Sequence, residues 1–243
     1  MARNTYGLDL GSYEIKVYDK KQDTIWKEKN VLAVQDKKEI IAIGEDAYQM
    51  YEKTPPDIEV AFPMRDGVIS RFNDMQNLLQ NILKKNRHFS RGAEYVIAVP
   101  TDVTEVQKKA FFDLVIHSNA KAREVNIVER SIADAVGLGI DVQNTTGVMI
   151  INFGGETTEL SVLTEGGIVF NRLLKLGGTT LDQEIVNLVR NSHDFLIGSR
   201  TAEILRQQFD VFNGDSETAF SVAGRDLITG LPMRKTISIT LVR

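Results

Sequence analysis

The strongest signal for the fold is the segment Met149-Ile-Ile-Asn-Phe-Gly-Gly-Glu-Thr-Thr-Glu-Leu-Ser-Val-Leu163. The run Val148–Ile151 is apolar with no 3.6-residue period, and Glu159–Leu163 alternates polar and apolar residues. This pattern predicts two strands joined by a tight Gly154-Gly155 turn. Because glycine tolerates a positive φ and carries no Cβ, we expect backbone N–H groups of the turn to converge on one point and bind an anion, typically phosphate. An ordinary β-hairpin is the simpler interpretation of this stretch alone.

A second copy of the plan lies near the start of the chain, at Tyr6-Gly-Leu-Asp-Leu-Gly-Ser-Tyr-Glu-Ile-Lys-Val-Tyr18. The matched positions are Asp9 with Asn152, Gly11 with Gly154, and Ser12 near Thr157. Two such units far apart in one chain predict a duplicated fold in which two phosphate loops face each other across a nucleotide. Asp9 would then hold a Mg²⁺ ion through water, as carboxylates near triphosphates do.

Length, charge and cysteine content restrict the class of protein. A chain of 243 residues is long enough for one large or two small domains with a proper core. The net charge of −4 argues against a nucleic-acid partner, which requires a concentrated basic face. The absence of cysteine excludes disulfides, thiolate metal sites and cysteine nucleophiles. Neither a membrane-spanning apolar run nor a signal segment is recognisable, so we expect a cytoplasmic location.

Helix and strand patterns alternate along the chain, which predicts an α/β fold with mixed sheets covered by helices. The clearest helices are Asn73–Asn86 and Thr104–Ser118, with Asn73 and Thr104 as their N-caps. Thr180-x-x-Gln183 predicts a capping box. Other expected helices are 44–51, 131–138, 181–191 and 200–209, and other expected strands are 24–34, 40–43, 95–99, 123–128, 167–175, 217–222 and 236–241, with a turn-rich link at 224–232.

The order of elements restarts at Val148 and so predicts two lobes. Residues 1–140 would form the first lobe, with a small inserted subdomain at about 31–63, and residues 141–243 the second. The helix-strand-helix continuation of the first half is missing after the second hairpin, so we expect the second lobe to be partial. No Gly-x4-Gly-Lys-Ser/Thr and no Gly-x-Gly-x-x-Gly pattern occurs, which leaves a P-loop or Rossmann site unsupported.

Segments spread in order over nearly the whole chain resemble the MreB family of bacterial actins, within the superfamily of actin, sugar kinases and heat-shock chaperones. The similar segments are 7–11, 54–55, 63–69, 99–100, 103–106, 122–125, 154–155, 157–159, 166–169, 196–198, 200–203, 224–227 and 229–232. The resemblance implies an actin-like ATPase (duplicated ribonuclease-H-like) fold, with ATP and Mg²⁺ between the lobes. It also implies membrane-associated filaments that maintain cell shape by guiding cell-wall synthesis. The implied partners are further copies of the chain, cell-shape and wall-synthesis proteins, and the inner face of the cell membrane.

The resemblance also assigns nucleotide-binding residues by position. They are Asp9, Ser12, Tyr13 and Glu14 in the first loop, Gly154, Gly155, Glu156 and Thr157 in the second, and Glu203 and Arg206 at the nucleoside. By spacing alone, Glu203 and Arg206 stand at i and i+3 on one helix face, where a surface ion pair is an equally good interpretation.

The chain departs from the family pattern where hydrolysis would be organised. Asn152 stands where the family has an aspartate, and Arg130 where it has the glutamate that positions the attacking water. Arg130 cannot accept a proton, and the adjacent Glu129, the alternative catalytic candidate, would point about 100° away. Glu156 replaces the third loop glycine, and its carboxylate would repel a triphosphate. The chain also ends before the family's late glycine-rich segment.

Three functions follow from these patterns. The ordered similar segments favour an MreB-like protein that binds ATP and polymerises. The departures favour a degenerate actin-fold scaffold or regulator with little or no ATP hydrolysis. A sugar kinase rests on analogy of fold alone and would need a catalytic aspartate near a sugar pocket. Phe89, flanked by basic Arg87 and Arg91, is a candidate for lipid contact, although a phenylalanine packed on its own domain is the simpler interpretation.

Overall fold

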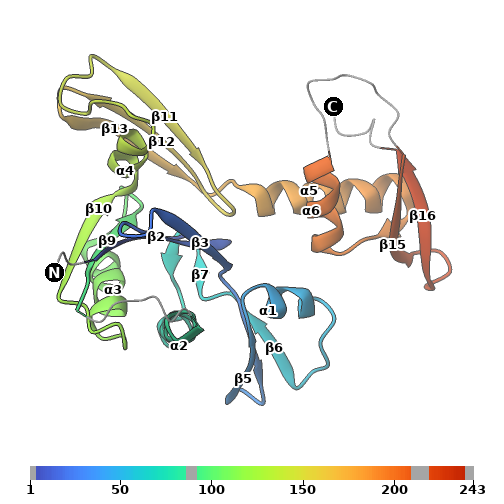
Figure 1. Ribbon diagram of the computed structural model, residues 1–243. Helices are drawn as coiled ribbons and strands as arrows, with labels where there is room; N and C mark the ends of the chain where they lie inside the picture. Colours follow the sequence, from blue (N-terminus) through green and yellow to red (C-terminus); the bar gives the residue numbers. More distant parts are fainter. Residues whose placement is uncertain (1–3, 86–91, 209–218, 239–243) are drawn as a thin grey trace. The chain divides into compact units, whose positions relative to one another are not determined.

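The computed structural model describes residues 4–85, 92–208 and 219–238 of the chain. It divides into two compact units, Met1–Lys175 and Leu176–Arg243 (Figure 1). These units are defined by how compactly their residues pack. The two lobes predicted to meet near residue 140 were defined by the repeated order of elements, and they stay a prediction. The lipid-contact candidate Phe89, with Arg87 and Arg91, lies outside the described residues.

A five-stranded sheet in the first unit has the order β10-β9-β1-β2-β3. Strands β1 (Thr5–Leu10), β2 (Glu14–Asp19) and β3 (Thr24–Lys29) are antiparallel neighbours, and β9 (Glu94–Val99) and β10 (Glu124–Glu129) extend the sheet in parallel from β1. The single strand expected at 24–34 is wrong, because the chain breaks between β3 and β4 (Leu32–Gln35). The buried Asn30 lies in this break, and its N–H continues the pairing of β3 with β2 by donating to the Tyr13 carbonyl at 3.0 Å.

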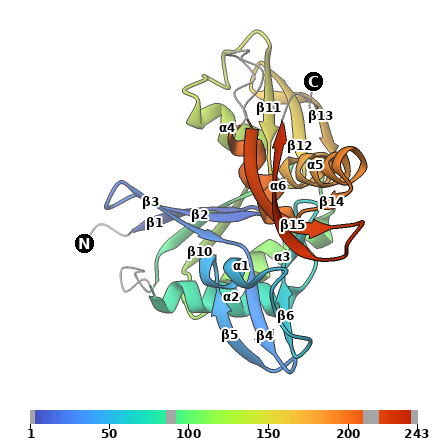
Figure 2. The same ribbon diagram turned by 90° about the vertical axis from the view of Figure 1, so that its right-hand side faces the viewer.

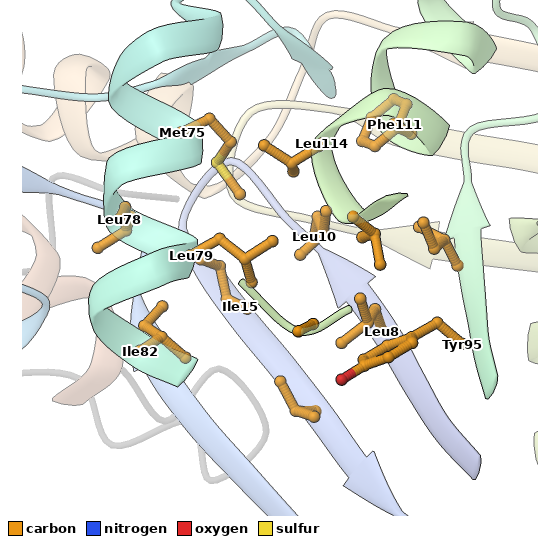
Figure 3. Close-up of a cluster of buried hydrophobic side chains, with 14 of the residues drawn as sticks. Leu8, Leu10, Ile15, Met75, Leu78, Leu79, Ile82, Tyr95, Phe111 and Leu114 are labelled. Atoms are coloured by element: carbon orange, nitrogen blue, oxygen red, sulfur yellow. The ribbon is translucent and has the colours of Figure 1, made fainter. Parts of the chain in front are cut away.

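Helices α2 (Phe72–Lys85) and α3 (Glu105–Ile116) bury their apolar faces against one side of this sheet (Figure 3). Four of the five apolar positions predicted for the first helix are buried, since Met75, Leu78, Leu79 and Ile82 are at most 2% exposed, and the fifth, Leu83, is partly buried. Side chains from β1, β2 and β9 complete this cluster, among them Leu8, Leu10, Ile15 and Tyr95.

The two N-cap predictions have different outcomes. Thr104 caps α3 as predicted, since its hydroxyl accepts the Gln107 N–H at 3.3 Å and the Gln107 side chain accepts the Thr104 N–H at 2.8 Å. The prediction for Asn73 is wrong, because α2 already includes Phe72 and the Arg71 carbonyl accepts the Met75 N–H at 3.0 Å.

Residues 32–61 form a small three-stranded sheet in the region where the sequence predicts an inserted subdomain. Its order is β5-β4-β6, with β5 at Glu39–Ile43 and β6 at Ile58–Ala61, and α1 (Glu45–Met50) packs beside it (Figure 2). Its own buried cluster is built around Val31, Ala33 and Ala47.

The second repeat of the hairpin plan lies in a three-stranded antiparallel sheet of the first unit. Its strands are β11 (Val148–Phe153), β12 (Thr158–Thr164) and β13 (Gly167–Leu174). Helix α4 (Arg130–Gly137) packs on the inner face of this sheet through Ala135, which is buried with Ile150 and Leu163. The short strands β7 (Met64–Arg65) and β8 (Val68–Ile69) form a separate hairpin.

The second unit contains α5 (Gly178–His193), β14 (Phe195–Leu196), α6 (Ser199–Gln208), β15 (Ala219–Asp226) and β16 (Pro232–Ser238). Its core is a buried cluster that includes Phe195, Ile185 and Leu205. The capping box predicted at Thr180 is wrong, because α5 begins at Gly178 and Thr180 lies in its first turn. The Thr180 hydroxyl instead accepts the Gly177 N–H at 3.4 Å.

The link predicted at 224–232 is also shorter than expected, because β15 continues to Asp226. Gly224 fits inside this strand for a steric reason: a Cβ there would lie 2.4 Å from the Leu196 carbonyl oxygen of the neighbouring strand. Two parts of the predicted strands lie outside the described residues: the first two residues of 217–222 and the last three of 236–241. Across the described ranges, no helix has both the length and the apolar composition needed to cross a membrane.

Candidate functional site

The two glycine hairpins have the same geometry. The Gly11 N–H donates to the Glu14 carbonyl at 3.1 Å in the first, and the Gly154 N–H donates to the Thr157 carbonyl at 2.8 Å in the second. This equivalence makes Glu14 the counterpart of Thr157, so the expected match of Ser12 with Thr157 is wrong by two positions.

Glycine is required in these turns because of space. Gly11, Gly154 and Gly155 all have a negative φ, so the expected left-handed turn is wrong. A Cβ on Gly11 would lie 2.8 Å from the Glu14 carbonyl oxygen, and one on Gly154 would lie 2.9 Å from that of Thr157. The N–H groups of Gly11 and Gly154 donate to carbonyls within their own turns. The backbone N–H groups that are predicted to bind an anion would therefore have to belong to other residues.

Both hairpins line one pocket of about 250 Å³ within the first unit. The hairpins approach closely, since a Cβ on Gly155 would lie 2.6 Å from the Cβ of Tyr13. Every residue assigned to the two loops by sequence lines this pocket: Asp9, Ser12, Tyr13, Glu14, Gly154, Gly155, Glu156 and Thr157. The lining also includes Lys16, Gly67, Arg130, Asn152, Phe153 and Glu159. The structure therefore brings the two sequence repeats together, and their roles toward a nucleotide stay a prediction.

The turn between β7 and β8 ties the two loops to each other. The Asp66 N–H donates to Glu156 Oε2 at 2.7 Å, and the Gly67 N–H donates to the Ser12 hydroxyl at 3.2 Å. Arg65 adds an ion pair to Glu156 Oε1 at 3.1 Å. Sequence reasoning did not include this turn in the site, although Asp-Gly between two short strands is a recognised hairpin signal.

These contacts change the expectation for Glu156. Its side chain is 15% exposed, and both carboxylate oxygens are held by groups of the β7–β8 turn. The positive charge of Arg65 offsets the carboxylate charge at 3.1 Å. The repulsion of a triphosphate expected for a bare carboxylate is therefore reduced.

Tyr13 is held on the other side of the first loop. Lys29 donates to the Tyr13 hydroxyl, and the Tyr13 ring meets the edge of the Tyr48 ring at a centroid distance of 6.1 Å. Asn30 supports the same loop by donating from Nδ2 to the Gly11 carbonyl at 2.7 Å. The small subdomain and the strand before it thus fix the first loop in place.

Asp9 lies between two cations. It faces Lys16 across the β1–β2 hairpin, and Lys16 Nζ lies 3.0 Å from Asp9 Oδ2. The other carboxylate oxygen, Oδ1, lies 3.6 Å from an Nη2 nitrogen of Arg130. Arg130 is the first residue of α4 and its side chain is 11% exposed. The structure thus places the family-departing arginine inside the pocket and against Asp9.

Asn152 occupies the register position of Asp9 in the second hairpin, and its Nδ2 donates to Asp134 Oδ2 on α4 at 2.6 Å. Burial raises the pKa of Asp134, while the bond from Asn152 and the charge of Arg130 oppose that rise. Sequence reasoning missed Asp134, although its position four residues after Arg130 in a helix places the two on one face.

Glu159 faces Asn152 across the β11–β12 hairpin, at the position that Lys16 has in the first hairpin. Its side chain is buried, and its Oε1 accepts the Thr101 N–H at 2.9 Å and Asn171 Nδ2 at 2.9 Å. Its Oε2 is buried with no hydrogen-bond partner. The two repeats therefore place a lysine and a glutamate at equivalent positions of the two hairpins.

Glu129 and the helix pair lie elsewhere. Glu129 caps α4 by position, without a side-chain capping bond, and lines a different pocket with residues of 132–143 and 166–168. Glu203 and Arg206 belong to α6 in the second unit. Arg206 Nε lies 2.6 Å from Asp182 of α5, and Glu203 accepts a bond from Gln207 at 3.1 Å. Their predicted contact with a nucleoside stays a prediction.

The side chains around Asp9 do not fit the Mg²⁺ site predicted from sequence. Mg²⁺ in phosphate sites is held by one or two carboxylates together with waters and phosphate oxygens. Here both oxygens of Asp9 face cations, and Asn152 directs an N–H donor at Asp134. In the described ranges no group of three acidic, histidine or cysteine side chains is arranged to hold a metal ion. A divalent cation next to Asp9 would meet the Arg130 guanidinium.

The paired hairpins, the mixed sheets and the pocket lined by both repeats define a protein of the actin-like ATPase fold class, which confirms the predicted fold. The MreB/Mbl protein family model matches residues 3–243. The chain therefore belongs to the MreB/Mbl family, and the recognition made from sequence is confirmed.

Two relatives from this family are identical to the chain at about a third of the aligned positions. The cell shape-determining protein MreB of Escherichia coli K12 is 34% identical over 247 residues, which cover 98% of this chain and 71% of the relative. The cell shape-determining protein Mbl of Bacillus subtilis is 31% identical over 237 residues, which cover 96% and 70%. The chain is thus a bacterial actin-like protein similar to cell shape-determining proteins.

Solved structures agree with this assignment. MreB5 of Spiroplasma citri bound to AMPPNP matches with a TM-score of 0.90 and 31% identity, over 98% of this chain and 72% of that protein. A structure of the same protein bound to ADP matches with a TM-score of 0.88. The MamK double helical filament, at 18% identity and a TM-score of 0.76, shows the fold alone.

Proposed function

We propose that this chain is a nucleotide-binding bacterial actin that polymerises on the inner face of the cell membrane and guides cell-wall synthesis. ATP is the proposed nucleotide, bound with its phosphates in the pocket between the two hairpins. The observation that carries the proposal is that all eight loop residues assigned from sequence line this one pocket. The crystallisation of MreB5 with AMPPNP and with ADP supports the same class of ligand.

The assembly partner in this proposal is a second copy of the chain, followed by cell-shape and wall-synthesis proteins. The location is the cytoplasm at the membrane face. Family membership supports these statements, since the relatives are named as cell shape-determining proteins. Phe89 is the proposed candidate for lipid contact. Liposome binding of wild type and of Phe89→Ser tests this role: loss of binding in the variant supports it, and unchanged binding refutes it.

A second candidate function is a nucleotide-gated scaffold that binds ATP and does not hydrolyse it. The observation that favours it is Arg130 in the pocket, because an arginine cannot take a proton from an attacking water. Glu129 lines another pocket and so gains no support as a substitute base. We propose slow or absent hydrolysis on this basis.

Calorimetric titration of the purified chain with ATP, followed by phosphate release and sedimentation of filaments from the same sample, tests both candidates. Binding with assembly and without phosphate release identifies the scaffold. Binding with release identifies the full cycle of a bacterial actin. Absence of nucleotide binding refutes the proposed site, and absence of sedimenting polymer at any concentration tested, with or without nucleotide, refutes the filament.

A further inference from the structure

Two cationic side chains, Lys16 and Arg130, line the pocket beside Asp9. Lys16 is opposite Asp9 because of the β1–β2 register, and its Nζ lies 3.0 Å from the carboxylate. Arg130 opens α4, directly after β10, and its side chain is mostly buried against the pocket. Backbone pairing and the helix start therefore set where both side chains leave the chain, and the ion pair with Asp9 orients the 44% exposed Lys16 side chain.

Arg130 stands at an unfavourable place for a cation unless it has anionic partners. The N-terminus of a helix carries a partial positive charge, which repels an arginine there. Asp9 lies 3.6 Å away, and Asp134 lies one helical turn later on α4, where the charge of Arg130 opposes the rise that burial causes in the Asp134 pKa. These partners leave the planar guanidinium in the pocket, and guanidinium groups match phosphate oxygens with paired N–H donors.

We propose that Arg130, assisted by Lys16, replaces the divalent cation at this site and binds the polyphosphate of the nucleotide directly. This inference rests on the proposed nucleotide binding and deepens it. Asp9 then orients the two cations and is not a metal ligand, and Asn152 fixes Asp134 beside them. The affinity of the chain for a nucleotide should consequently depend little on Mg²⁺.

The test is titration of the full chain with AMPPNP, a non-hydrolysable probe, once in excess Mg²⁺ and once in EDTA. We expect the dissociation constant to differ by less than about threefold between the two conditions, a difference of under about 0.7 kcal/mol. A loss of about tenfold or more in EDTA overturns the inference while leaving the proposed nucleotide site intact. Absence of binding in both conditions refutes the site and the inference together.

Charge reversal at Arg130 gives the second arm. Arg130→Glu places a carboxylate beside Asp9, so we expect binding in EDTA to weaken by at least about tenfold and to be restored in part by Mg²⁺. Arg130→Lys keeps the cation and should keep most of the Mg²⁺-independent binding. Equal affinities of wild type and Arg130→Glu in EDTA would overturn the role of Arg130.

Arg172→Glu is the matched control, since Arg172 is exposed on β13 and absent from the pocket lining. The same charge reversal there should leave the ratio of the two dissociation constants unchanged. If Arg172→Glu changes the ratio of the two dissociation constants as much as Arg130→Glu does, the net charge of the protein controls the Mg²⁺ dependence and the guanidinium in the pocket does not. Circular dichroism checks that each variant is folded. The comparison of AMPPNP binding by wild type in Mg²⁺ and in EDTA tests the inference without any variant.

Discussion

At the scale of single residues, the loop glycines are fixed by contacts that a sequence does not display. Gly155 is the sharpest case, because its missing side chain is what lets the second loop approach Tyr13. The sequence correctly singled out a Gly-Gly turn. It assigned the glycines to a positive φ, whereas the structure requires them for close packing of one loop on another.

Gly155→Ala should lower the free energy of unfolding by about 1–3 kcal/mol, since the new Cβ would lie 2.6 Å from the Tyr13 Cβ. Urea denaturation measures the effect. Gly137→Ala is the control, because nothing lies within 4 Å of a Cβ there and the residue ends α4. We expect the control to be neutral or slightly more stable. Equal stability of Gly155→Ala and wild type would contradict the close approach of the loops.

The raised pKa of Asp134 predicts a pH dependence. Burial raises this pKa above the ordinary 3.8, so the folded state favours the neutral carboxyl and is penalised at neutral pH. The stability linked to the neutral form is complete below pH 3.8 and is lost as pH rises through the folded-state pKa. Asp134→Asn removes the charge and can still accept the bond from Asn152.

We therefore expect Asp134→Asn to melt at a higher temperature than wild type at pH 7. The difference should shrink as the pH falls through the raised pKa of the wild-type Asp134 carboxyl, because that carboxyl is then protonated. Thermal melts at several pH values check this. An Asp134→Asn variant that melts below wild type at pH 7 would show that the charged carboxylate stabilises the fold through Arg130.

At the scale of elements, the start of α3 is held by a local device that the sequence specifies completely. Thr104 and Gln107 satisfy each other's backbone N–H groups. Thr104→Ala should lower the free energy of unfolding by about 1 kcal/mol, and Thr104→Ser should retain most of it. Urea midpoints of the two variants provide the measurement. Similar losses in both would assign the effect to the Thr104 methyl group instead of the hydroxyl.

The failed helix starts have a different origin. For α2 and α5, the sequence offered Asn73 and Thr180 as caps, and each helix instead begins before its expected cap. A local capping pattern shows which residues can serve as the N-cap of a helix. Packing of the apolar face decides how many residues before that position also become helical. Phe72, which packs against the main core, is drawn into α2 in this way.

At the scale of the whole molecule, each compact unit has its own buried cluster, one around Phe111 and one around Phe195. Trp26 is the single tryptophan of the chain and packs against the first cluster. Its fluorescence therefore reports on the first unit, while far-ultraviolet circular dichroism reports on both.

Phe195→Ala should destabilise the second unit by about 3–5 kcal/mol and lower the transition seen by circular dichroism more than the one seen by Trp26 fluorescence. Phe111→Ala should lower the fluorescence transition by a similar free energy. Parallel urea titrations with the two probes make the comparison. Coincident shifts of both probes in Phe195→Ala would show that the units unfold as one.

The class of fold, the two hairpin repeats, the family and eight of the residues that line the pocket were all predictable from the sequence. These features depend on local patterns, namely strand alternation, glycine turns and segment order, which are carried by neighbouring residues in the chain. The departures at Asn152, Glu156 and Arg130 were also visible as residue types.

Tertiary structure alone decided what those departures do. Glu156 is paired by Arg65 and Asp66, Asn152 is bonded to Asp134, and Arg130 faces Asp9. These partners lie on separate elements, and most of them are distant in sequence. A charge in a pocket acts on whatever lies within a few ångströms of it, and only the folded chain brings those groups to that distance.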